Sequence, residues 1–523
     1  MMGDAKITTH HEVYNTSETA SDADARELAL IGKKAILRRN FSPLAILGVA
    51  CASTVTWEAM FSLFIFGLLN GGPAGLLYGF LFCWLGWAAV VATMAELVSM
   101  WPTAGGQYHW TYMLAPEKWK RGLSYSTGWQ SIIAWQATTA SAAYLSATAC
   151  QGLVINNRPD YVPERWHGTM MVFALILVAL LFNTFLFKFL PQVETVVLFF
   201  HITLFVVFII VITVRSPTKS SNDEVWTLFL NKGGYESKGL SFFVGLITPL
   251  FAFCGADSAV HMSEEIRGAS RVVPWAMMMS ILINGLTGFC MLIAILYCMG
   301  DIDAALASPT GYPFIEILTQ VVSSISGGTA LSALLVVMFC FANLTLVAST
   351  SRQLWAFARD RAVPHSRAVG YVDKRMKVPI TSLAITCIVT CLLSLINIGS
   401  AAVLNGVLSL AVAGFFGSYL IPFTLFFYKR IKYPEEVPPG PWTMGRWGVF
   451  VNGFAIVWAV VVMFFSFWPT SVPVTPVNMN WSCVLWTAVI LFALGFWALH
   501  GKNVYTGPVV ETDVEGLGRV EHA

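Results

Sequence analysis

Long apolar runs restrict the fold of this chain more than any other feature of its sequence. A helix that crosses a bilayer core about 30 Å thick needs roughly 20 predominantly apolar residues. Twelve runs of this kind cover residues 44–69, 74–100, 123–149, 167–187, 192–214, 241–261, 274–299, 330–350, 379–398, 402–428, 449–468 and 481–500. The sequence therefore predicts an all-α membrane protein with about twelve transmembrane helices.

The composition agrees with this fold class and excludes several functions. The chain is 56% hydrophobic and 11% charged, whereas soluble domains are roughly one quarter charged. It has no ATP-binding loop, no HExxH motif and no dinucleotide fingerprint, so we expect neither an enzyme nor an ATP-driven pump. His261, Glu264 and Glu265 lack further ligands nearby, and the ten cysteines form no CxxC pair. We expect no cofactor, no metal site and no nucleic-acid partner.

The distribution of Lys and Arg predicts the orientation. If the N-terminus is cytoplasmic, 25 of the 31 basic residues fall on the cytoplasmic side, most densely in residues 352–377. This bias follows the positive-inside rule with both termini inside. The predicted organisation is a disordered cytoplasmic tail (1–42), a transmembrane transporter domain (43–500) and a cytoplasmic tail (501–523). Asn480 begins a formal glycosylation sequon, Asn-Trp-Ser, close to the outer membrane surface.

Most of the predicted spans carry no charge. The exceptions are Glu58, Glu96, Glu194, Asp257 and His201, the last being the histidine expected to lie deep in the bilayer. An ionisable group at bilayer depth costs at least about 2.5 kcal/mol on insertion scales, so each needs a partner, a neutral form or a water-filled cavity. His201 is the candidate for proton coupling, because the charge of histidine changes near physiological pH. The alternative is a neutral, hydrogen-bonded structural histidine.

Two spans carry weak helical segments at mid-depth. Residues 48–56 in the first span and 254–258 in the sixth are rich in small and polar residues. Backbone can leave the helix there only if the freed N–H and C=O groups line a protein or aqueous site. The alternative is close packing between helices, which also favours small residues. The two spans are five apart, as expected of inverted repeats.

Several long motifs then indicate a family. NGGPAGLLYGF (70–80), the stretch AELVSMWPTAGGQYHWTYML and its continuation (95–129), FAFCGADSAVHMSEEIRGASRVVPWAM (251–277) and SRQLWAFARDRAVPHS (351–366) stand in this order. The chain resembles the amino acid, polyamine and organocation permease superfamily, most closely its fungal branch of amino acid, GABA and choline permeases. This resemblance implies two inverted five-helix repeats, as in the LeuT-like fold, plus two C-terminal helices, and transport by alternating access.

The resemblance also implies a substrate site between broken helices one and six. The first break would fall on residues 51–57 and the second on residues 254–258. The candidate substrate-binding residues are Cys51, Ala52, Ser53, Thr54, Trp57, Glu58, Cys254, Gly255, Ala256, Asp257 and Ser258. In the first span CASTVTWE stands where a glycine-rich break is expected, which argues against an ordinary α-amino acid substrate.

The chemistry of such a site suits an amine. Exposed N–H groups at a helix N-terminus favour a carboxylate, while freed carbonyls and an acidic side chain favour an ammonium group. Asp257 and Glu58 are the candidate cation partners, and Trp57 offers a face for a cation–π contact. The alternatives are purely structural roles: a helix-packing contact for Glu58 and a core position for Trp57. A cytoplasmic set of charges is expected to close the inner gate, or else to be ordinary loop charge: Glu264, Glu265, Arg267, Arg271, Arg352, Arg359, Asp360 and Arg361.

The leading functional hypothesis is a secondary transporter of a small amine-bearing solute, such as an amino acid, GABA or a choline-like compound. Its expected partners are that solute, the lipid bilayer and a co-transported proton, and its expected location is the plasma membrane, with the vacuolar membrane as the alternative. A second hypothesis is an exporter or vacuolar loader of an alkaloid-like amine. A third is a nutrient sensor, against which the short tails argue.

Overall fold

The computed structural model describes residues 28–29, 31–34, 36–399, 403–476 and 478–511. These residues are helical and form no β-strand, only two isolated bridges, Phe41 with Ile266 and Asn70 with Asn231. The chain divides into two compact units, one of residues 1–35 with 510–523 and one of residues 36–509. In the first unit, Glu511 N donates to Gly32 O at 2.7 Å. Most of the two predicted tails, residues 1–27 and 512–523, lies outside the described residues.

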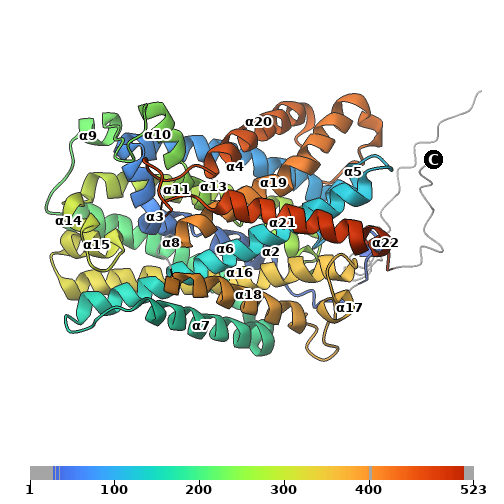
Figure 1. Ribbon diagram of the computed structural model, residues 1–523, viewed down its shortest axis with the longest axis horizontal. Coiled ribbons are helices and arrows are strands. Elements are labelled where there is room, and N and C mark those ends of the chain that lie inside the picture. Colours follow the sequence, from blue (N-terminus) through green and yellow to red (C-terminus); the bar gives the residue numbers. More distant parts are fainter. Residues whose placement is uncertain (1–27, 30, 35, 400–402, 477, 512–523) are drawn as a thin grey trace, which may run out of the picture. The chain divides into compact units, whose positions relative to one another are not determined.

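The second unit is a bundle of helices (Figure 1). Its first half consists of α2 (Pro43–Thr54), α3 (Thr56–Leu69), α4 (Gly72–Met100), α5 (Gln107–Leu114), α6 (Lys120–Asn157), α7 (Arg165–Leu181) and α8 (Leu190–Arg215). There follow α9 (Asn222–Thr227), α10 (Lys238–Gly245), α11 (Ile247–Phe251), α12 (Ser258–His261), α13 (Ala269–Cys298), α14 (Ile302–Leu306), α15 (Pro313–Val322), α16 (Ile325–Arg359), α17 (Ser366–Val369), α18 (Ile380–Gly399) and α19 (Val403–Lys432). The last helices are α20 (Gly448–Ser466), α21 (Ser482–Phe496) and α22 (Lys502–Val504).

The helices account for the predicted spans. Among the described residues, nine helices are long and apolar enough to cross a membrane. One of the nine, residues 165–215, contains two predicted spans, because the turn between α7 and α8 remains helical as a π-turn and a short 3-10 turn. Predicted span 123–149 lies in α6, whose Ser, Thr and Gln residues lower its hydropathy. Predicted span 241–261 is divided among α10, α11 and α12. The all-α membrane fold class is confirmed.

The packing of the bundle joins helices that are five spans apart. α4, the second span, packs along α13, the seventh, and α6, the third, packs along α16, the eighth. This pairing is the one expected of two repeats of five helices. The two C-terminal helices are peripheral: α20 packs on α4 and α19, and α21 packs on α6 and α19 (Figure 1).

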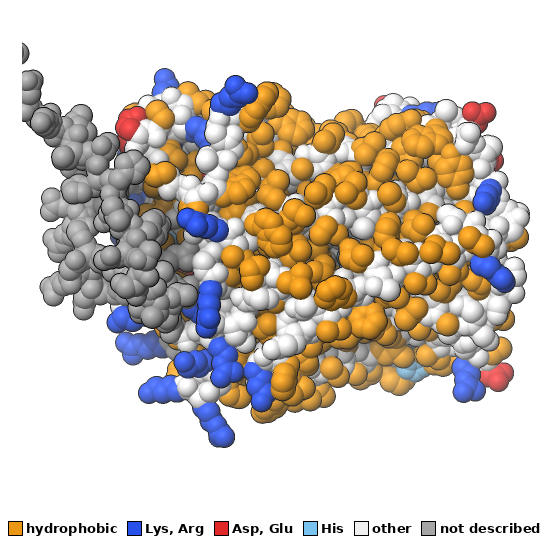
Figure 2. Space-filling view, turned by 180° about the vertical axis from the view of Figure 1, so that it is seen from behind, with side chains coloured by type: hydrophobic (Ala, Val, Ile, Leu, Met, Phe, Trp, Pro, Cys, Tyr) orange, Lys and Arg blue, Asp and Glu red, His pale blue; other side chains and the backbone are white. Residues whose placement is uncertain are grey.

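The outer surface of the bundle is apolar. Figure 2 shows a broad hydrophobic belt, with Lys and Arg gathered toward one end. Large apolar side chains on several helices of the bundle are more than half exposed, among them Leu177, Phe199, Leu392, Val457 and Leu491. Soluble monomers rarely expose contiguous apolar area on this scale, and such a belt is typical of proteins that span a membrane.

The segments predicted to be cytoplasmic meet at one end of the bundle, here called the basic end. It contains residues 36–42, 101–122, 262–268, 352–378, 433–447 and 501–509. Hydrogen bonds connect these segments, for example from Phe41 N to Glu265 O, from Tyr108 Oη to Asp360 and from Arg121 to Tyr505 O. The part of the predicted C-terminal tail up to Val509 therefore packs on the bundle, with Tyr505 wholly buried.

Asn480, the formal glycosylation site, is 1% exposed. Its side-chain amide nitrogen donates to Ser409 Oγ at 3.0 Å, Ser466 O at 2.8 Å and Trp468 O at 3.0 Å. The folded protein therefore does not present this nitrogen for modification.

Candidate functional site

The first span leaves the helical conformation at Val55. Its φ of 38° and ψ of 48° lie in the left-handed region, between the end of α2 and the start of α3. A β-branched residue rarely adopts this conformation, and such strain concentrates at functional sites. The interruption falls within the segment 51–57 that the resemblance implied.

The sixth span is interrupted between α11 and α12. Residues 252–257 form a succession of turns, and Gly255 has a φ of +93°. A Cβ atom on Gly255 would lie 3.0 Å from Ser53 O, so this position needs glycine both for its backbone conformation and for the close approach. Thr56 Oγ1 also donates to Ala252 O at 2.7 Å. The two interruptions therefore contact each other directly.

A small cavity of about 30 Å³ lies at this contact. Its lining comes from both interruptions and from α3, α6 and α16: Ser53, Thr54, Val55, Ala59, Thr138, Ala142, Leu145, Ser146, Phe251, Cys254, Phe339, Ala342 and Leu346. A volume of this size holds about two water molecules, whereas drug-sized ligand sites occupy about 300–1,000 Å³. The cavity in this structure is therefore much smaller than such a site.

The hydroxyl groups of the cavity face it as acceptors. Ser53, Thr138 and Ser146 each donate their proton to a carbonyl of their own helix, at 2.7–2.8 Å. Each oxygen keeps lone pairs that can accept a hydrogen bond from a ligand. Phe251 and Phe339 add aromatic rings, which attract cations. The lining contains no carboxylate, so its chemistry suits a cationic group held by neutral oxygens and rings.

Only part of the predicted substrate set lines this cavity. Ser53, Thr54 and Cys254 are in the lining. Other predicted residues at the interruptions are buried but lie outside the lining: Cys51, Ala52, Gly255, Ala256 and Ser258. The contributions of α6 and α16 were not predicted. Thr138, Ala142 and Ser146 recur at every fourth position, and this stripe of small residues along one helix face could have indicated them.

Asp257 does not line the cavity and contacts α5 instead. Its Oδ2 accepts a hydrogen bond from Gln107 Nε2 at 2.6 Å and lies 3.5 Å from His261 Nε2. His261 Nδ1 lies 2.8 Å from Ala104 O, and because a carbonyl only accepts, Nδ1 carries the proton. The carboxylate is wholly buried and connects the sixth-span interruption to the start of α5. His261 connects α12 to the segment after α4.

Glu58 and His201 form a buried pair. Glu58 Oε1 and His201 Nδ1 lie 2.8 Å apart, and both side chains are at most 1% exposed. Trp57 packs beside the pair, with its ring 6.0 Å from that of His201 and 5.4 Å from that of Phe208. Within the described residues, Glu58 Oε2 and His201 Nε2 have no hydrogen-bond partner. The structure thus joins two residues that the sequence singled out separately, in an aromatic environment between α3 and α8.

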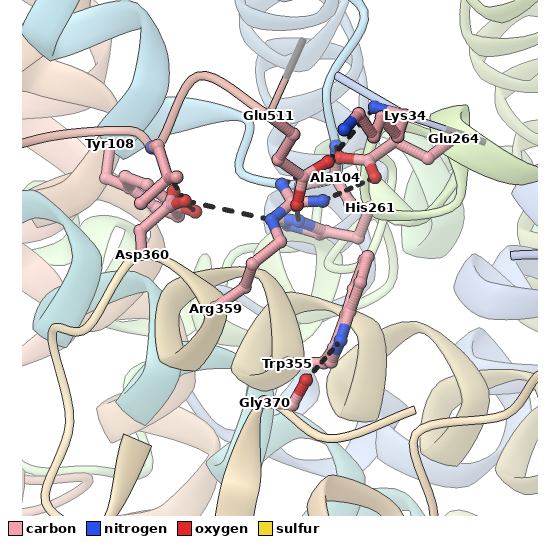
Figure 3. Close-up of polar contacts among 11 residues, drawn as sticks. Lys34, Ala104, Tyr108, His261, Glu264, Trp355, Arg359, Asp360, Gly370 and Glu511 are labelled. Carbon is pink, nitrogen blue, oxygen red and sulfur yellow. Dashed lines mark hydrogen bonds and ion pairs between the residues drawn. The ribbon is translucent and has the colours of Figure 1, made fainter. Parts of the chain in front are cut away.

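Ion pairs connect segments of the basic end to one another (Figure 3). Arg359 binds Glu264 through two hydrogen bonds, Nη1 to Oε2 at 2.7 Å and Nη2 to Oε1 at 3.0 Å. Glu264 Oε1 also accepts from Ala104 N at 3.1 Å, and Arg352 Nε lies 2.8 Å from Glu265 Oε1. These bonds connect the segment after α12 to α16 and to the segment after α4.

Tyr108 and Asp360 extend this set of contacts, which Figure 3 also shows. Tyr108 Oη donates to Asp360 Oδ2 at 2.7 Å. Burial, followed by the charge of Asp360, raises the pKa of Tyr108 well above its ordinary value, so the phenol stays protonated and remains a donor. Val509 N donates to the other oxygen, Oδ1, at 3.0 Å, which attaches the C-terminal segment to the end of α16.

The long apolar helices of the bundle place the chain in the class of multi-pass membrane proteins. The family model described as amino acid permease matches residues 44–489, and the chain belongs to this family, whose members are membrane transporters. The superfamily resemblance drawn from the motifs is confirmed. No group of three or more His, Cys, Asp or Glu side chains that could hold a metal ion occurs in the described part of the chain.

Three relatives illustrate the similarity. A candidate amino acid/polyamine transporter of Macrophomina phaseolina is 33% identical over 84% of this chain and 96% of its own length. A choline transporter of Saccharomyces cerevisiae is 32% identical over 92% of this chain and 85% of its own length. Amino-acid permease 2 of Neurospora crassa is 26% identical, over 95% and 91% respectively.

Proposed function

We propose that this protein is a secondary transporter that moves a small amine-bearing solute by alternating access. The observation that carries the proposal is the direct contact of two interrupted helices around a cavity lined by hydroxyl acceptors and aromatic rings. The names of the relatives, which include a choline transporter and an amino acid permease, support the same solute class. We further propose that the basic end faces the cytoplasm, in accordance with the positive-inside rule.

Within this class the lining favours organic cations over zwitterions. A choline-like ammonium needs no hydrogen-bond donor from the protein, and the cavity oxygens of Ser53, Thr138 and Ser146 already use their protons within their own helices. A solute with a carboxylate would need donors that this lining does not supply. This preference is tested by competition: uptake of a labelled amine into vesicles is measured in the presence of quaternary amines, GABA or α-amino acids. Stronger competition by α-amino acids than by quaternary amines would contradict the preference.

Filling the cavity should abolish transport. Ala342 of α16 is buried and lines the cavity, so Ala342→Leu adds three carbon atoms to a space of only about 30 Å³. We expect uptake of labelled solute to fall at least tenfold, as an order of magnitude for a blocked site, because the helices can no longer rearrange around a solute there. Uptake is measured in vesicles and normalised to the amount of folded protein.

Ala330→Leu is the matched control for this experiment. Ala330 lies on the same helix but is exposed, so a larger side chain at this position has space. This variant should transport as the parent does. Normal uptake by Ala342→Leu would show that the solute does not pass through this cavity.

We propose that the Glu58–His201 pair couples solute movement to a proton. The two side chains share one hydrogen bond at 2.8 Å, beside the first-span interruption and out of contact with water. A proton that enters this pair changes its net charge, and in a low-dielectric setting that charge favours a different helix arrangement. Neither side chain lines the cavity, so coupling would act through α3 and α8.

Flux against external pH tests this coupling. We expect uptake by the parent to rise severalfold as the external pH falls, because the co-transported proton then becomes more concentrated outside. Glu58→Gln and His201→Gln should flatten the profile. His500→Gln, at an exposed position, should leave it unchanged. If uptake by the parent did not depend on external pH, proton coupling would be excluded.

The direction of solute transport needs a separate test, because alternating access permits transport in either direction. Deleting the protein from its cell should lower the intracellular level of an imported solute and raise that of an exported one. An intracellular rise of an alkaloid-like amine would favour the export hypothesis.

A further inference from the structure

A second pocket lies at the basic end, away from the transport cavity. It has a volume of about 520 Å³ and opens between the first two turns of α6, with the two residues Lys118 and Trp119 before them, and the end of α21 with the π-turn that follows, Trp497–Gly501. α21 packs along α6 at this place (Figure 1). Its lining includes three basic residues, Lys118, Arg121 and Lys502, and large apolar side chains, Trp119, Leu494 and Trp497.

The three basic residues give this pocket a net positive charge. Within the described residues, none of them forms an ion pair with a carboxylate. The guanidinium of Arg121 donates only to carbonyls, to Tyr505 O and Lys502 O at 2.7–3.0 Å. The neighbouring acid, Glu117, is paired with Lys120 at 2.5 Å. The pocket therefore offers uncompensated charge to an anion.

The apolar side of the pocket continues into the lipid-facing surface. Trp119, just before α6, is 60% exposed, and Leu494 of α21 is 52% exposed. Leu491 and Phe492, one turn earlier in α21, are also exposed. Tryptophan and lysine are typical of the boundary between lipid and water. A charged recess thus adjoins an apolar wall, which matches a molecule with an anionic headgroup and hydrocarbon chains.

We propose that this pocket binds an anionic phospholipid of the adjacent leaflet. Its phosphate and acidic headgroup contact Lys118, Arg121 and Lys502, and its acyl chains lie along α21. The basic residues supply the charge complementarity, since each Lys or Arg near a membrane surface strengthens binding of anionic lipid about fivefold. An inorganic anion shares the phosphate chemistry but cannot use the apolar wall.

The site is placed to act on the basic end. Arg121 and Lys502 flank Tyr505, which is wholly buried, and the same segment reaches Asp360 through Val509 N at 3.0 Å. Asp360 adjoins Arg359, whose guanidinium binds Glu264. A bound lipid therefore stabilises the C-terminal segment in the position that secures the closed basic end.

Native mass spectrometry of the purified full-length protein tests the proposal. The probes are phosphatidylserine and phosphatidylcholine with identical acyl chains, and inorganic phosphate as the arm without acyl chains. The variant Lys118→Gln with Lys502→Gln removes two charges at exposed positions, and Lys374→Gln with Lys377→Gln removes two exposed charges elsewhere at the same end. Apparent Tm without lipid verifies that each variant is folded.

We expect the parent and the control variant to prefer phosphatidylserine, and the pocket variant to bind it about 25-fold more weakly with unchanged phosphatidylcholine binding. Phosphatidylserine should also raise the apparent Tm of the parent, and phosphate alone should not. The proposal is overturned if the parent shows no preference between the lipids, if the two double variants lose equal affinity, or if inorganic phosphate stabilises as well as the lipid does.

Discussion

Replacing Glu264 with alanine should destabilise the closed basic end by about 3–5 kcal/mol, because it removes the bidentate carboxylate of a buried arginine. Arg359 is 8% exposed and Glu264 4% exposed, so water screens this pair little. Asp360 Oδ1 remains 3.7 Å from Arg359 Nε and limits the loss to the lower part of this range. The apparent Tm of the detergent-solubilised protein measures the change in stability.

A double-mutant cycle separates the pair from its surroundings. Arg359→Met should cost about as much as Glu264→Ala, and the two together should cost less than their sum, because in the double variant neither member of the Glu264–Arg359 pair is left buried without the other. The exposed pair Lys232–Asp303 is the control, and its removal should leave the apparent Tm unchanged. Additive effects at Glu264 and Arg359 would show that the two act independently.

The same variants should make the cavity more accessible from the basic end. Cys254 lines the cavity and is 2% exposed, so a thiol reagent reaches it only when the helices separate. We expect Glu264→Ala to label at Cys254 several times faster than the parent, with Cys254→Ala as the reference for labelling at other cysteines. An unchanged labelling rate at Cys254 would show that the Glu264–Arg359 pair does not control access to the cavity.

Gly48→Ala should be the most damaging single-methyl substitution in the first span. A Cβ atom at Gly48 would lie 2.3 Å from Glu194 O, a backbone atom of α8, so the two helices must move apart. Overpacking of this kind typically costs 1–3 kcal/mol, and here the obstacle is backbone and cannot rotate away. We expect a lower apparent Tm and a loss of most transport, measured on the same preparations.

Gly495→Ala is the matched control for this prediction. Gly495 lies within α21, and no described atom lies within 4 Å of the place its Cβ would take. Alanine favours a helix by about 0.8–1.0 kcal/mol over glycine, so this variant should keep or raise the apparent Tm. An equal loss in both variants would contradict the prediction, because it would show that the close α2–α8 contact at Gly48 does not account for the effect.

The buried acids mark the limit of prediction from sequence in this protein. Asp257 and Glu58 were recognisable as costly polar groups in apolar spans, and both lie beside the interruptions. Their partners were not recognisable, since Gln107 is 150 residues from Asp257 and His201 is 143 residues from Glu58. In the structure each acid contacts its own partner and neither lines the cavity. The hydroxyl groups and rings of the cavity come from four separate parts of the chain.

The sequence by itself determined the fold class, the number of spans and the gathering of basic loops at one end. These properties depend on the transfer of each segment between water and lipid, which local hydropathy and the count of Lys and Arg measure directly. The tertiary structure decided which side chains meet: the Glu58–His201 pair, the Glu264–Arg359 pair and the lining from α6 and α16. Such contacts depend on the rotation and approach of helices distant in the chain, which the close packing of small residues sets and no local pattern encodes.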